Sequence, residues 1–515
     1  MSEIGATKGS RPRTGRKICD NIGLRGIMPG KQNARNPRSG FAYWMDEVLK
    51  EADKAADGFA ADPVHDLRVA LRRCRSMAEG LRAIDPDPSW KKMRKMGKGL
   101  FSALGDLRDC QVLMEWTEKL ASGDSAVEAA LLGYLRVQEK ALKQNAEAAL
   151  QDFDRKQWRA WSRSLTRRSA RLQLGSEPFQ SLALERWTQA RRLHGQAMRA
   201  NAPVAYHRLR IGLKKFRYVV ENFLPELHEE WAKGLKRMQD LLGEVHDLDV
   251  LWETLLRADV LSNNDARQRW HERIDQERQT RIDAYRREMD GPDSLWQVWR
   301  SALPRGREAR NAAFRKLQVW ASYLDPDTAH SRRVARWALQ LHDGLSRVGM
   351  LGHNHTNSRE YLQAAATVHE VGRSEGRKGH RKSTEKLVRE VDRPFSWTRQ
   401  DQELIAFIAR YHGGSLPDQT QNGLRRLQPQ QRPLAQLLAG ILRLADAFDA
   451  DRKGSIRRVR VSADDGVVIY AEGLDNRSSL AERIAGARHL LELSCGCPVL
   501  VRPMPAARKR QKTGP

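Results

Sequence analysis

The sequence predicts a mainly α-helical protein, and three features of the chain support this prediction. Apolar residues recur at the helical period from Phe41 to about Trp299. A second helical pattern begins near Glu308, after the turn-forming segment Leu303-Pro-Arg-Gly306. Beyond Gly454 the pattern changes to short alternating runs, which predicts a small α+β segment at the end of the helical chain.

These changes in pattern predict the domain organisation. Residues 1–38 are rich in Gly, Arg, Lys, Pro and Asn and lack an apolar run of signal-peptide length, so we expect a disordered basic arm. The remaining domains are expected to be a helical domain at 39–303 with halves of about 39–175 and 176–303, a second helical domain at 304–454, a small α+β subdomain at 455–503, and a basic tail at 504–515.

The composition indicates a polyanionic partner. The 515 residues include 91 Lys plus Arg against 64 Asp plus Glu, giving a net charge of +27. Such a surplus attracts nucleic acid, polyphosphate or an acidic membrane surface alike. Five Cys, odd in number and scattered, give no disulfide framework and favour a reducing compartment. No apolar stretch approaches the ~20 residues of a membrane span, so we expect a cytoplasmic protein with no membrane partner.

One cationic stretch occurs twice: the segment from His65 to Arg75 recurs from His207 to Arg217, residue class for residue class. At about 100° per residue, the offsets 0, +3, +7 and +10 fall within roughly 80°, so each copy forms one stripe on a helix. The intervening positions are mostly apolar and suit packing. The stripes consist of His65, Arg68, Arg72 and Arg75 in the first copy and of His207, Arg210, Lys214 and Arg217 in the second.

These stripes predict an anionic ligand. Like charges one turn apart repel by about a few tenths of a kcal/mol per pair, so a helix gains nothing by aligning them alone. For one such helix a solvated face is the better interpretation. A second copy with the same offsets and a leading His reverses that preference. Arg binds phosphate oxygens through bidentate forks and Lys as a mobile point charge, so the spacing favours an elongated polyanion.

A second pair of matching segments follows the stripes. Leu104-Gly-Asp-Leu-Arg-Asp-Cys-Gln-Val112 corresponds to Leu242-Gly-Glu-Val-His-Asp-Leu-Asp-Val250. Here the chain resembles the CHAD domain, the conserved-histidine α-helical domain. In that family two four-helix halves are each marked by an H-x-x-R-x-x-x-[RK]-x-x-R helix and a later L-G-x-x-[RH]-D-x-x-V segment. The resemblance covers about residues 39 to 303.

The resemblance implies that inorganic polyphosphate binds in a basic groove between two helical-bundle halves, and it suggests association with polyphosphate granules. Lys95 and Lys98 lie in step with Lys233 and Lys236, so these lysines join the expected site. The residues expected to bind polyphosphate are His65, Arg68, Arg72, Arg73, Arg75, Lys95, Lys98, His207, Arg210, Lys214, Lys215, Arg217, Lys233 and Lys236.

A second constellation lies in the C-terminal half. His330, the pair His369-Glu370 and the distant Asp446 follow one another on expected helices. Imidazoles and carboxylates from separate helices are what an all-helical metal phosphohydrolase needs. Their order resembles the HD superfamily. More closely, residues 308 to 503 resemble the C-terminal HD-like domain of the exopolyphosphatase/guanosine-pentaphosphate phosphatase family. If this domain holds a metal, the resemblance implies Mg²⁺ or Mn²⁺ on these four residues.

Departures from that resemblance favour an accessory or degenerate domain. A strict HD site has Asp where this chain has Glu370. Related sequences read G-H-H-K-H-S where this one reads Gly379-His-Arg-Lys-Ser-Thr384, and Arg381 would oppose a second metal ion. No P-loop or glycine-rich phosphate loop of an actin-like catalytic domain is present. We therefore expect the four residues to be buried polar groups on an inherited scaffold, with little or no catalysis.

Three functions follow from the sequence, in this order. The first is polyphosphate binding, with the C-terminal domain extending or orienting the groove. The second is a metal-dependent phosphohydrolase acting on polyphosphate or a phosphorylated nucleotide through the C-terminal domain. The third is nucleic-acid binding, which is disfavoured because the stripes carry few aromatic residues to stack bases and no reading module is recognised. The sequence carries no signal for oligomeric state or chain-length preference.

Overall fold

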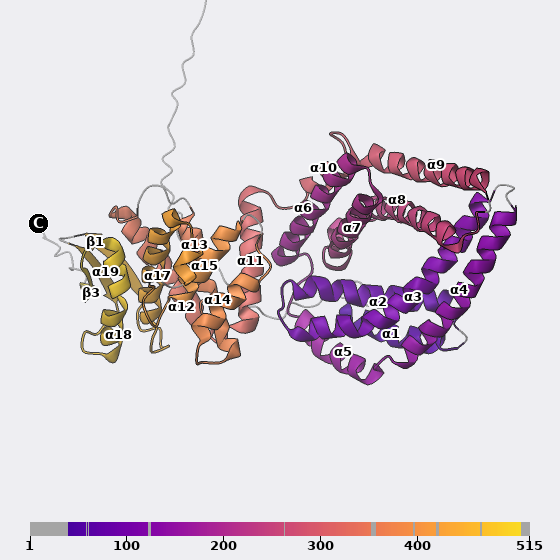
Figure 1. Ribbon diagram of the computed structural model, residues 1–515. Helices are drawn as coiled ribbons and strands as arrows, with labels where there is room; N and C mark the ends of the chain where they lie inside the picture. Colours follow the sequence, from indigo (N-terminus) through magenta and orange to yellow (C-terminus); the bar gives the residue numbers. More distant parts are fainter. Residues whose placement is uncertain are drawn as a thin grey trace, which may run out of the picture. The chain divides into compact units, whose positions relative to one another are not determined.

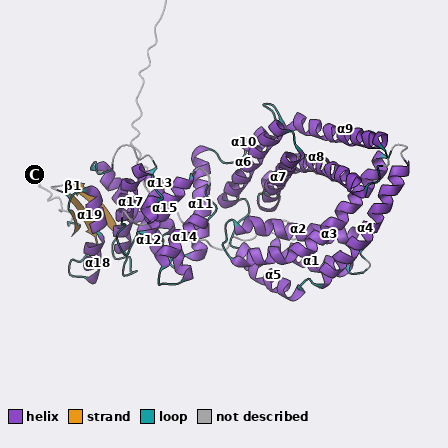
Figure 2. Ribbon diagram, in the orientation of Figure 1, coloured by secondary structure: helices purple, strands orange, loops and turns teal. Residues whose placement is uncertain are grey.

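Helices dominate the chain, as predicted (Figures 1 and 2). The computed structural model describes residues 40–57, 59, 61–121, 125–261, 263–351, 357–394, 397–418, 422–463 and 466–505. The expected basic arm and nearly all of the basic tail lie outside these residues. The predicted fold class, mainly α with a small α+β end, is confirmed. No helix in the described ranges combines the length and the apolar character that crossing a membrane requires.

The N-terminal part consists of helices α1 to α10 in the described residues. The first five are α1 (Phe41–Ala55), α2 (Ala61–Arg82), α3 (Pro88–Leu120), α4 (Ser125–Gln151) and α5 (Arg155–Ser169). The next five are α6 (Glu177–Ala200), α7 (Pro203–Phe223), α8 (Pro225–Ala258), α9 (Asn264–Met289) and α10 (Leu295–Ser301). The two cationic stripes lie on α2 and α7, and the second pair of matching segments lies on α3 and α8.

Local sequence signals explain where these helices begin and end. The side chain of Asp87 accepts a hydrogen bond from the backbone N–H of Ser89, and Pro88 occupies the first turn of α3. Asn201, at φ 45°, ends α6 in the left-handed conformation, and Pro203 opens α7 soon after. These turns set the starts of α3 and α7.

Helices α2 and α7 contact each other near their C-terminal ends. A Cβ on Gly80 would lie 2.3 Å from the Phe223 ring, so only glycine lets the helices approach this closely. Phe223 is itself stacked on Phe179 with ring centroids 4.3 Å apart. Asn222 Nδ2 donates a hydrogen bond to Ser76 Oγ at 3.0 Å. This contact fixes the two cationic helices with respect to each other.

The C-terminal part contains a second, separate helical core. Its central helix α17 (Arg432–Ala447) is almost wholly buried and packs against α12, α13 and α15. The helical elements are α11 (Gly306–Leu324), α12 (Thr328–Arg347), α13 (Ser358–Val368), η1 (Val371–Glu375), α14 (His380–Glu390), α15 (Arg399–Arg410), α16 (Asn422–Arg425), η2 (Pro429–Gln431) and α17.

A small sheet follows this core (Figure 2). Strand β1 (Arg458–Ala463) pairs antiparallel with β2 (Val467–Glu472), which pairs parallel with β3 (Val499–Pro503). Helices α18 (Ser479–Ala487) and α19 (His489–Cys495) connect β2 to β3. Helix α19 packs so closely on α17 that a Cβ added to Gly440 would lie 2.9 Å from the backbone of Leu491. The sheet and its two helices are therefore attached to α17, the helix that carries Asp446.

Candidate functional site

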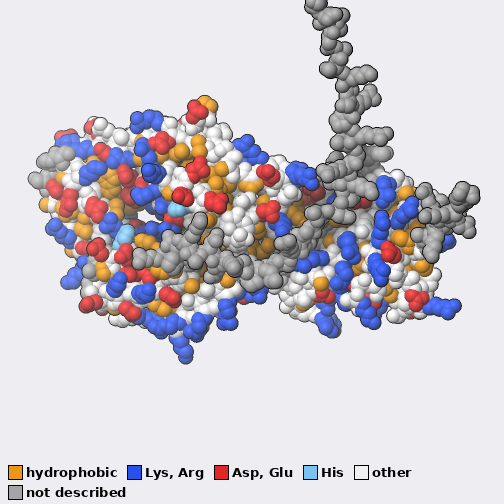
Figure 3. Space-filling view, turned by 180° about the vertical axis from the view of Figure 1, so that it is seen from behind, with side chains coloured by type: hydrophobic (Ala, Val, Ile, Leu, Met, Phe, Trp, Pro, Cys, Tyr) orange, Lys and Arg blue, Asp and Glu red, His pale blue; other side chains and the backbone are white. Residues whose placement is uncertain are grey.

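Four cations from equivalent positions of α2 and α7 lie near one another, and we name them the inter-half cation cluster: Arg68, Arg72, Arg210 and Lys214. Burial, followed by the charges of Arg210, Arg72 and Arg68, lowers the pKa of Lys214 to about 8. That combination shows that cations from both helices face the same ammonium group. The space-filling view shows a hollow in this domain with Lys, Arg and His side chains on its wall (Figure 3).

Most members of this cluster have no acidic partner. Among the described residues, Arg72, Arg210 and Lys214 form no ion pair, and the buried Nε of Arg210 has no hydrogen-bond partner. Arg68 lies 3.4 Å from an oxygen of Asp109. An unpartnered buried donor costs free energy that a ligand oxygen can recover. Four further predicted ligands have exposed side chains and form no ion pair among the described residues: His65, Lys95, Lys98 and Lys233.

Two predicted ligands serve instead as a symmetric brace between α2 and α7. Arg73 forms an ion pair with Glu221, and Lys215 lies 3.7 Å from Glu79. Arg73 and Lys215 occupy equivalent positions of the repeat, and so do Glu79 and Glu221, so each half contributes one cation and one acid. Sequence spacing predicts these cations but not their partners, because the acids lie on the other helix.

Three more predicted ligands are engaged locally. The guanidinium of Arg75 donates to the carbonyl oxygen of Arg94 at 2.6 Å and lies 5.0 Å from the Phe101 ring centroid. Arg217 lies 3.8 Å from the nearest carboxylate oxygen on its own helix, and Lys236 forms an ion pair with an acid one turn later at 2.6 Å. These three side chains therefore have local partners and do not belong to the inter-half cation cluster.

The second pair of matching segments adds neighbours that the sequence did not assign to the site. The rings of His207 and His246 lie 4.7 Å apart. Burial, and then the charge of Arg210, lowers the pKa of His246 to about 4, so its imidazole is neutral near pH 7. Burial raises the pKa of Asp247 to about 6. Both residues belong to the repeated L-G-x-x-[RH]-D pattern, and this repeat is the sequence signal that could have assigned them to the site.

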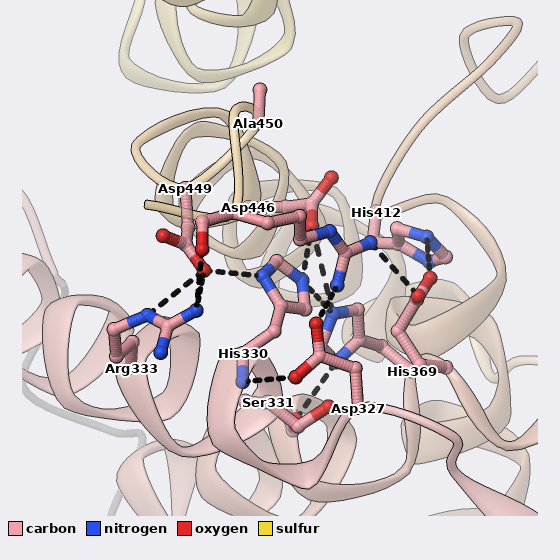
Figure 4. Close-up of polar contacts among 12 residues, drawn as sticks. Asp327, His330, Ser331, Arg333, His369, His412, Asp446, Asp449 and Ala450 are labelled. Carbon is pink, nitrogen blue, oxygen red and sulfur yellow. Dashed lines mark hydrogen bonds and ion pairs between the residues drawn. The ribbon is translucent and has the colours of Figure 1, made fainter. Parts of the chain in front are cut away.

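In the C-terminal domain His330 is fully buried between two carboxylates (Figure 4). Its Nδ1 lies 2.8 Å from Asp449 Oδ2 and its Nε2 lies 3.0 Å from Asp446 Oδ1. His369 Nε2 lies 3.6 Å from the same Asp446 oxygen. The ligand atoms of His330, His369 and Asp446 all lie within 4.8 Å of one another, and we name these residues the first triad.

The fourth predicted metal ligand, Glu370, belongs to a different group. Its Oε1 lies 3.5 Å from His380 Nε2 and 3.7 Å from His412 Nε2, and these three residues form the second triad. Its Oε2 accepts hydrogen bonds from Arg373 at 2.5 Å and from Arg452 at 3.0 Å. The expected set of four ligands is thus divided, and His380 and His412 complete the second set.

All four imidazoles are oriented in the same way. Each is held through Nδ1, His330 by the Asp449 carboxylate and the other three by a backbone carbonyl three residues earlier in the chain. Each Nε2 therefore points at a carboxylate oxygen of a triad. This arrangement is typical of metal-ligating histidines, whose second nitrogen is fixed by a carbonyl or carboxylate.

The electrostatics of the triads suit a divalent cation. Burial opposes ionisation of Asp446, but its bonds to His330 and His369 outweigh burial and hold its pKa well below the usual range. Burial likewise opposes ionisation of Glu370, yet the charge of His369 and the bond from Arg373 lower its pKa to about 2. Both carboxylates are therefore ionised near neutral pH. Carboxylate ligands suit Mg²⁺ and Mn²⁺, and imidazole ligands suit Zn²⁺ and other transition metals.

Arg381, which is expected from the sequence to oppose a second metal ion, does not itself face Glu370 among the ion pairs of the described residues. His380, one residue earlier, supplies the imidazole that faces Glu370. Helix α14 begins at His380 after Gly379, which has φ 81°, so the next side chain is turned about 100° away around the helix axis. Arg381 lies instead against Gly413 and Gly414. The expectation that Arg381 opposes a second ion stays a prediction.

Comparisons with known proteins support both predicted resemblances. Residues 42–256 match the family model described as CHAD domain, and residues 310–471 match the model described as Ppx/GppA phosphatase, domain III. The crystal structure of the CHAD domain from the plant Ricinus communis is similar at 21% identity over 48% of this chain and 88% of that chain, with a TM-score of 0.36. No curated protein matches the chain.

Proposed function

We propose that this chain, which carries a CHAD domain followed by a Ppx/GppA phosphatase domain III, binds inorganic polyphosphate at the inter-half cation cluster. The observation that carries the proposal is that Arg72, Arg210 and Lys214 converge from both halves without an acidic partner in the described residues. A polyphosphate chain carries negative charge along its length, so it can contact several cations of the cluster at once. Association with polyphosphate granules is part of this proposal.

The neighbouring side chains favour polyphosphate over nucleic acid. The ring of Phe101, the aromatic residue beside the stripe of α2, has the guanidinium groups of Arg68 and Arg75 at 6.0 and 5.0 Å from its centroid. It is therefore no free platform on which a base could stack. Exposed lysines on α3 and α8 extend the positive surface beyond the cluster. An extended phosphate chain uses all of these charges without any base contact.

The test compares two double variants, Arg68→Ala/Arg72→Ala and Arg210→Ala/Lys214→Ala, by retention of long-chain polyphosphate on native gels. Each lost charge-assisted contact is worth about 1.5–3 kcal/mol before solvent screening, so both variants should weaken binding at least about tenfold. The control Arg458→Gln/Arg460→Gln removes the same charge from exposed positions of β1 and should bind as the parent does. Equal competition by duplex DNA of matched charge at every salt concentration would favour nucleic-acid binding instead.

A second candidate function, metal-dependent phosphohydrolysis, is favoured by the two adjacent triads. Their six residues come from five separate segments of the C-terminal core, and the Nε2 of each imidazole faces a carboxylate oxygen. His330, His369 and Asp446 would hold one divalent ion, and Glu370, His380 and His412 would hold another. Such ions polarise phosphoryl oxygens and lower the pKa of bound water. Asp449 and the backbone carbonyls keep the imidazoles in the required orientation.

This candidate is tested by measuring Mn²⁺ binding and phosphate release together. The variants are His369→Ala/Glu370→Ala and His412→Ala, and the control is His489→Ala, whose side chain is 59% exposed. Phosphate release from polyphosphate that needs Mg²⁺ or Mn²⁺ and disappears in the first two variants would establish the enzyme. Metal binding without release, or neither, would leave the C-terminal domain as an accessory module.

A further inference from the structure

Two arginines of the C-terminal domain meet at a pair of glycines. A Cβ on Gly414, which has φ 78°, would lie 2.8 Å from Arg381 Nη2 and 3.0 Å from its Cζ. A Cβ on Gly413 would lie 3.3 Å from Arg381 Nη1. Arg443 donates from its Nη2 to the carbonyl oxygen of Gly414. The guanidinium groups of α14 and α17 therefore reach the same short stretch of backbone, which only glycine leaves open.

This arginine pair has no ion-pair partner in the part of the chain that the structure describes. Among the described residues neither Arg381 nor Arg443 forms an ion pair, and the buried Nη1 of Arg443 has no hydrogen-bond partner. Burial, and then the charge of Arg381, lowers the pKa of Arg443, which places the two cations close together. The other arginines around the triads all have carboxylate partners, namely Arg333, Arg373, Arg389, Arg410 and Arg452.

The arginine pair borders both triads. Arg381 directly follows His380, and Gly413 directly follows His412, so two members of the second triad are its neighbours in the chain. Arg443 lies three residues before Asp446 on α17, which places both on one face of that helix. The charge of Asp446 raises the pKa of Arg443, in agreement with this closeness. Gly414 is exposed, and Arg381 and Arg443 are half-buried.

We propose that Arg381 and Arg443 form a phosphate subsite of the C-terminal domain, which takes a terminal phosphoanhydride group or a phosphate monoester. Two guanidinium groups present planar sets of donors that match phosphate oxygens. A dianion neutralises both cations and supplies a partner for the donor that has none. The absence of side chains at Gly413 and Gly414 lets the Arg381 guanidinium lie against the backbone to which Arg443 donates. The subsite is separate from the inter-half cation cluster and does not depend on its ligand.

The experiment uses the full chain with Arg68, Arg72, Arg210 and Lys214 changed to Ala, so that the N-terminal cluster no longer contributes. Calorimetric titration with inorganic pyrophosphate, in the presence of a chelator, should reveal one saturable site. Adding Arg381→Ala or Arg443→Ala should weaken that site by about tenfold or more. The control Lys382→Ala removes the same charge from the adjacent, exposed position and should leave affinity unchanged. Arg443→Lys should keep part of it, because the charge remains.

Absence of a saturable site in this background, or an equal loss with Lys382→Ala, would overturn the proposal. Thermal melts by circular dichroism check that each variant folds, and a variant that does not fold is replaced by its Lys counterpart. Parallel titrations with orthophosphate, pyrophosphate and adenosine monophosphate distinguish free phosphate, a polyphosphate end and a nucleotide as sources, and each of these supports the subsite. The proposal for the N-terminal cluster fails separately: in that case the variant that lacks the four cluster cations binds long-chain polyphosphate as tightly as the parent does.

Discussion

At the scale of residues, the sequence predicts which side chains are cations or ligands, but partners decide what those side chains do. Arg72 and Arg73 are adjacent and both were expected to bind polyphosphate, yet Arg72 has no acidic partner in the described residues whereas Arg73 is paired with Glu221. The distinction depends on α7, a helix distant in the sequence, whose Asn222 also bonds to Ser76 of α2. Helical periodicity contains no information about such contacts.

Lys214 should make polyphosphate binding depend on pH. A lysine is charged below its pKa, which is about 8 here because of burial and the neighbouring arginines. Affinity should therefore be high below pH 8 and fall as pH rises through about 8, since the ammonium group is lost. Asp247, with a pKa of about 6, gains a negative charge beside the cluster as pH rises and should cause an earlier, smaller decline. Dissociation constants measured between about pH 5 and 9.5 test this.

The matched variant for this prediction is Lys214→Arg, which keeps its charge throughout that range. It should bind polyphosphate as the parent does near neutral pH and lose the decline near pH 8, while the decline near pH 6 persists. If Lys214→Arg retains the upper step unchanged, another group titrates there and the role assigned to Lys214 is wrong.

At the scale of elements, the helices were predictable because their signals are local, whereas their contacts were not. Capping by Asp87 and the proline after Asn201 can be recognised in the sequence, and the apolar faces of α2 and α7 follow from their period. The second triad was missed because α14, α15 and the turn after α13 come together only in the fold. Its histidines are 10 and 42 residues from Glu370 in sequence, and no spacing rule joins them.

The contact of α2 with α7 should depend on Gly80. The Phe223 ring cannot easily retreat from a new Cβ, because it is stacked on Phe179. Gly80→Ala should therefore destabilise the N-terminal domain by about 1–3 kcal/mol, the usual cost of overpacking a core. Urea unfolding followed by tryptophan fluorescence measures this change. Polyphosphate binding should weaken as well, because the cations of the two halves move apart.

Gly133 of α4 is the matched control, since nothing lies within 4 Å of a Cβ added there and the residue is exposed. Gly133→Ala should stabilise the protein by about 0.5–1 kcal/mol through helix propensity alone. The two substitutions are chemically identical and are expected to have opposite signs. Equal effects of both would show that Gly80 is not a close-packed contact.

At the scale of the whole molecule, a net charge of +27 attracts any polyanion, so affinity alone does not identify a site. What separates a built site from a general surplus is the arrangement of charge. The cation cluster joins equivalent positions of a duplicated domain, and the arginine pair lies beside the triads. Composition indicates the class of partner, and the repeat indicates where the first proposed site lies. The second proposed site is formed only when three separate segments, α14, the Gly413–Gly414 turn and α17, are folded together.

The salt dependence of polyphosphate binding should therefore distinguish the cluster from the net charge. Each cation that neutralises a phosphate releases condensed counterions, so the logarithm of the affinity falls linearly with the logarithm of salt concentration. Arg68→Ala/Arg72→Ala should make that slope shallower by about two, since each phosphate contact contributes about one. Arg458→Gln/Arg460→Gln removes the same net charge from β1 and should leave the slope unchanged. Equal slopes for the two variants would mean that polyphosphate responds only to the overall charge, and the inter-half cation cluster would then not be its binding site.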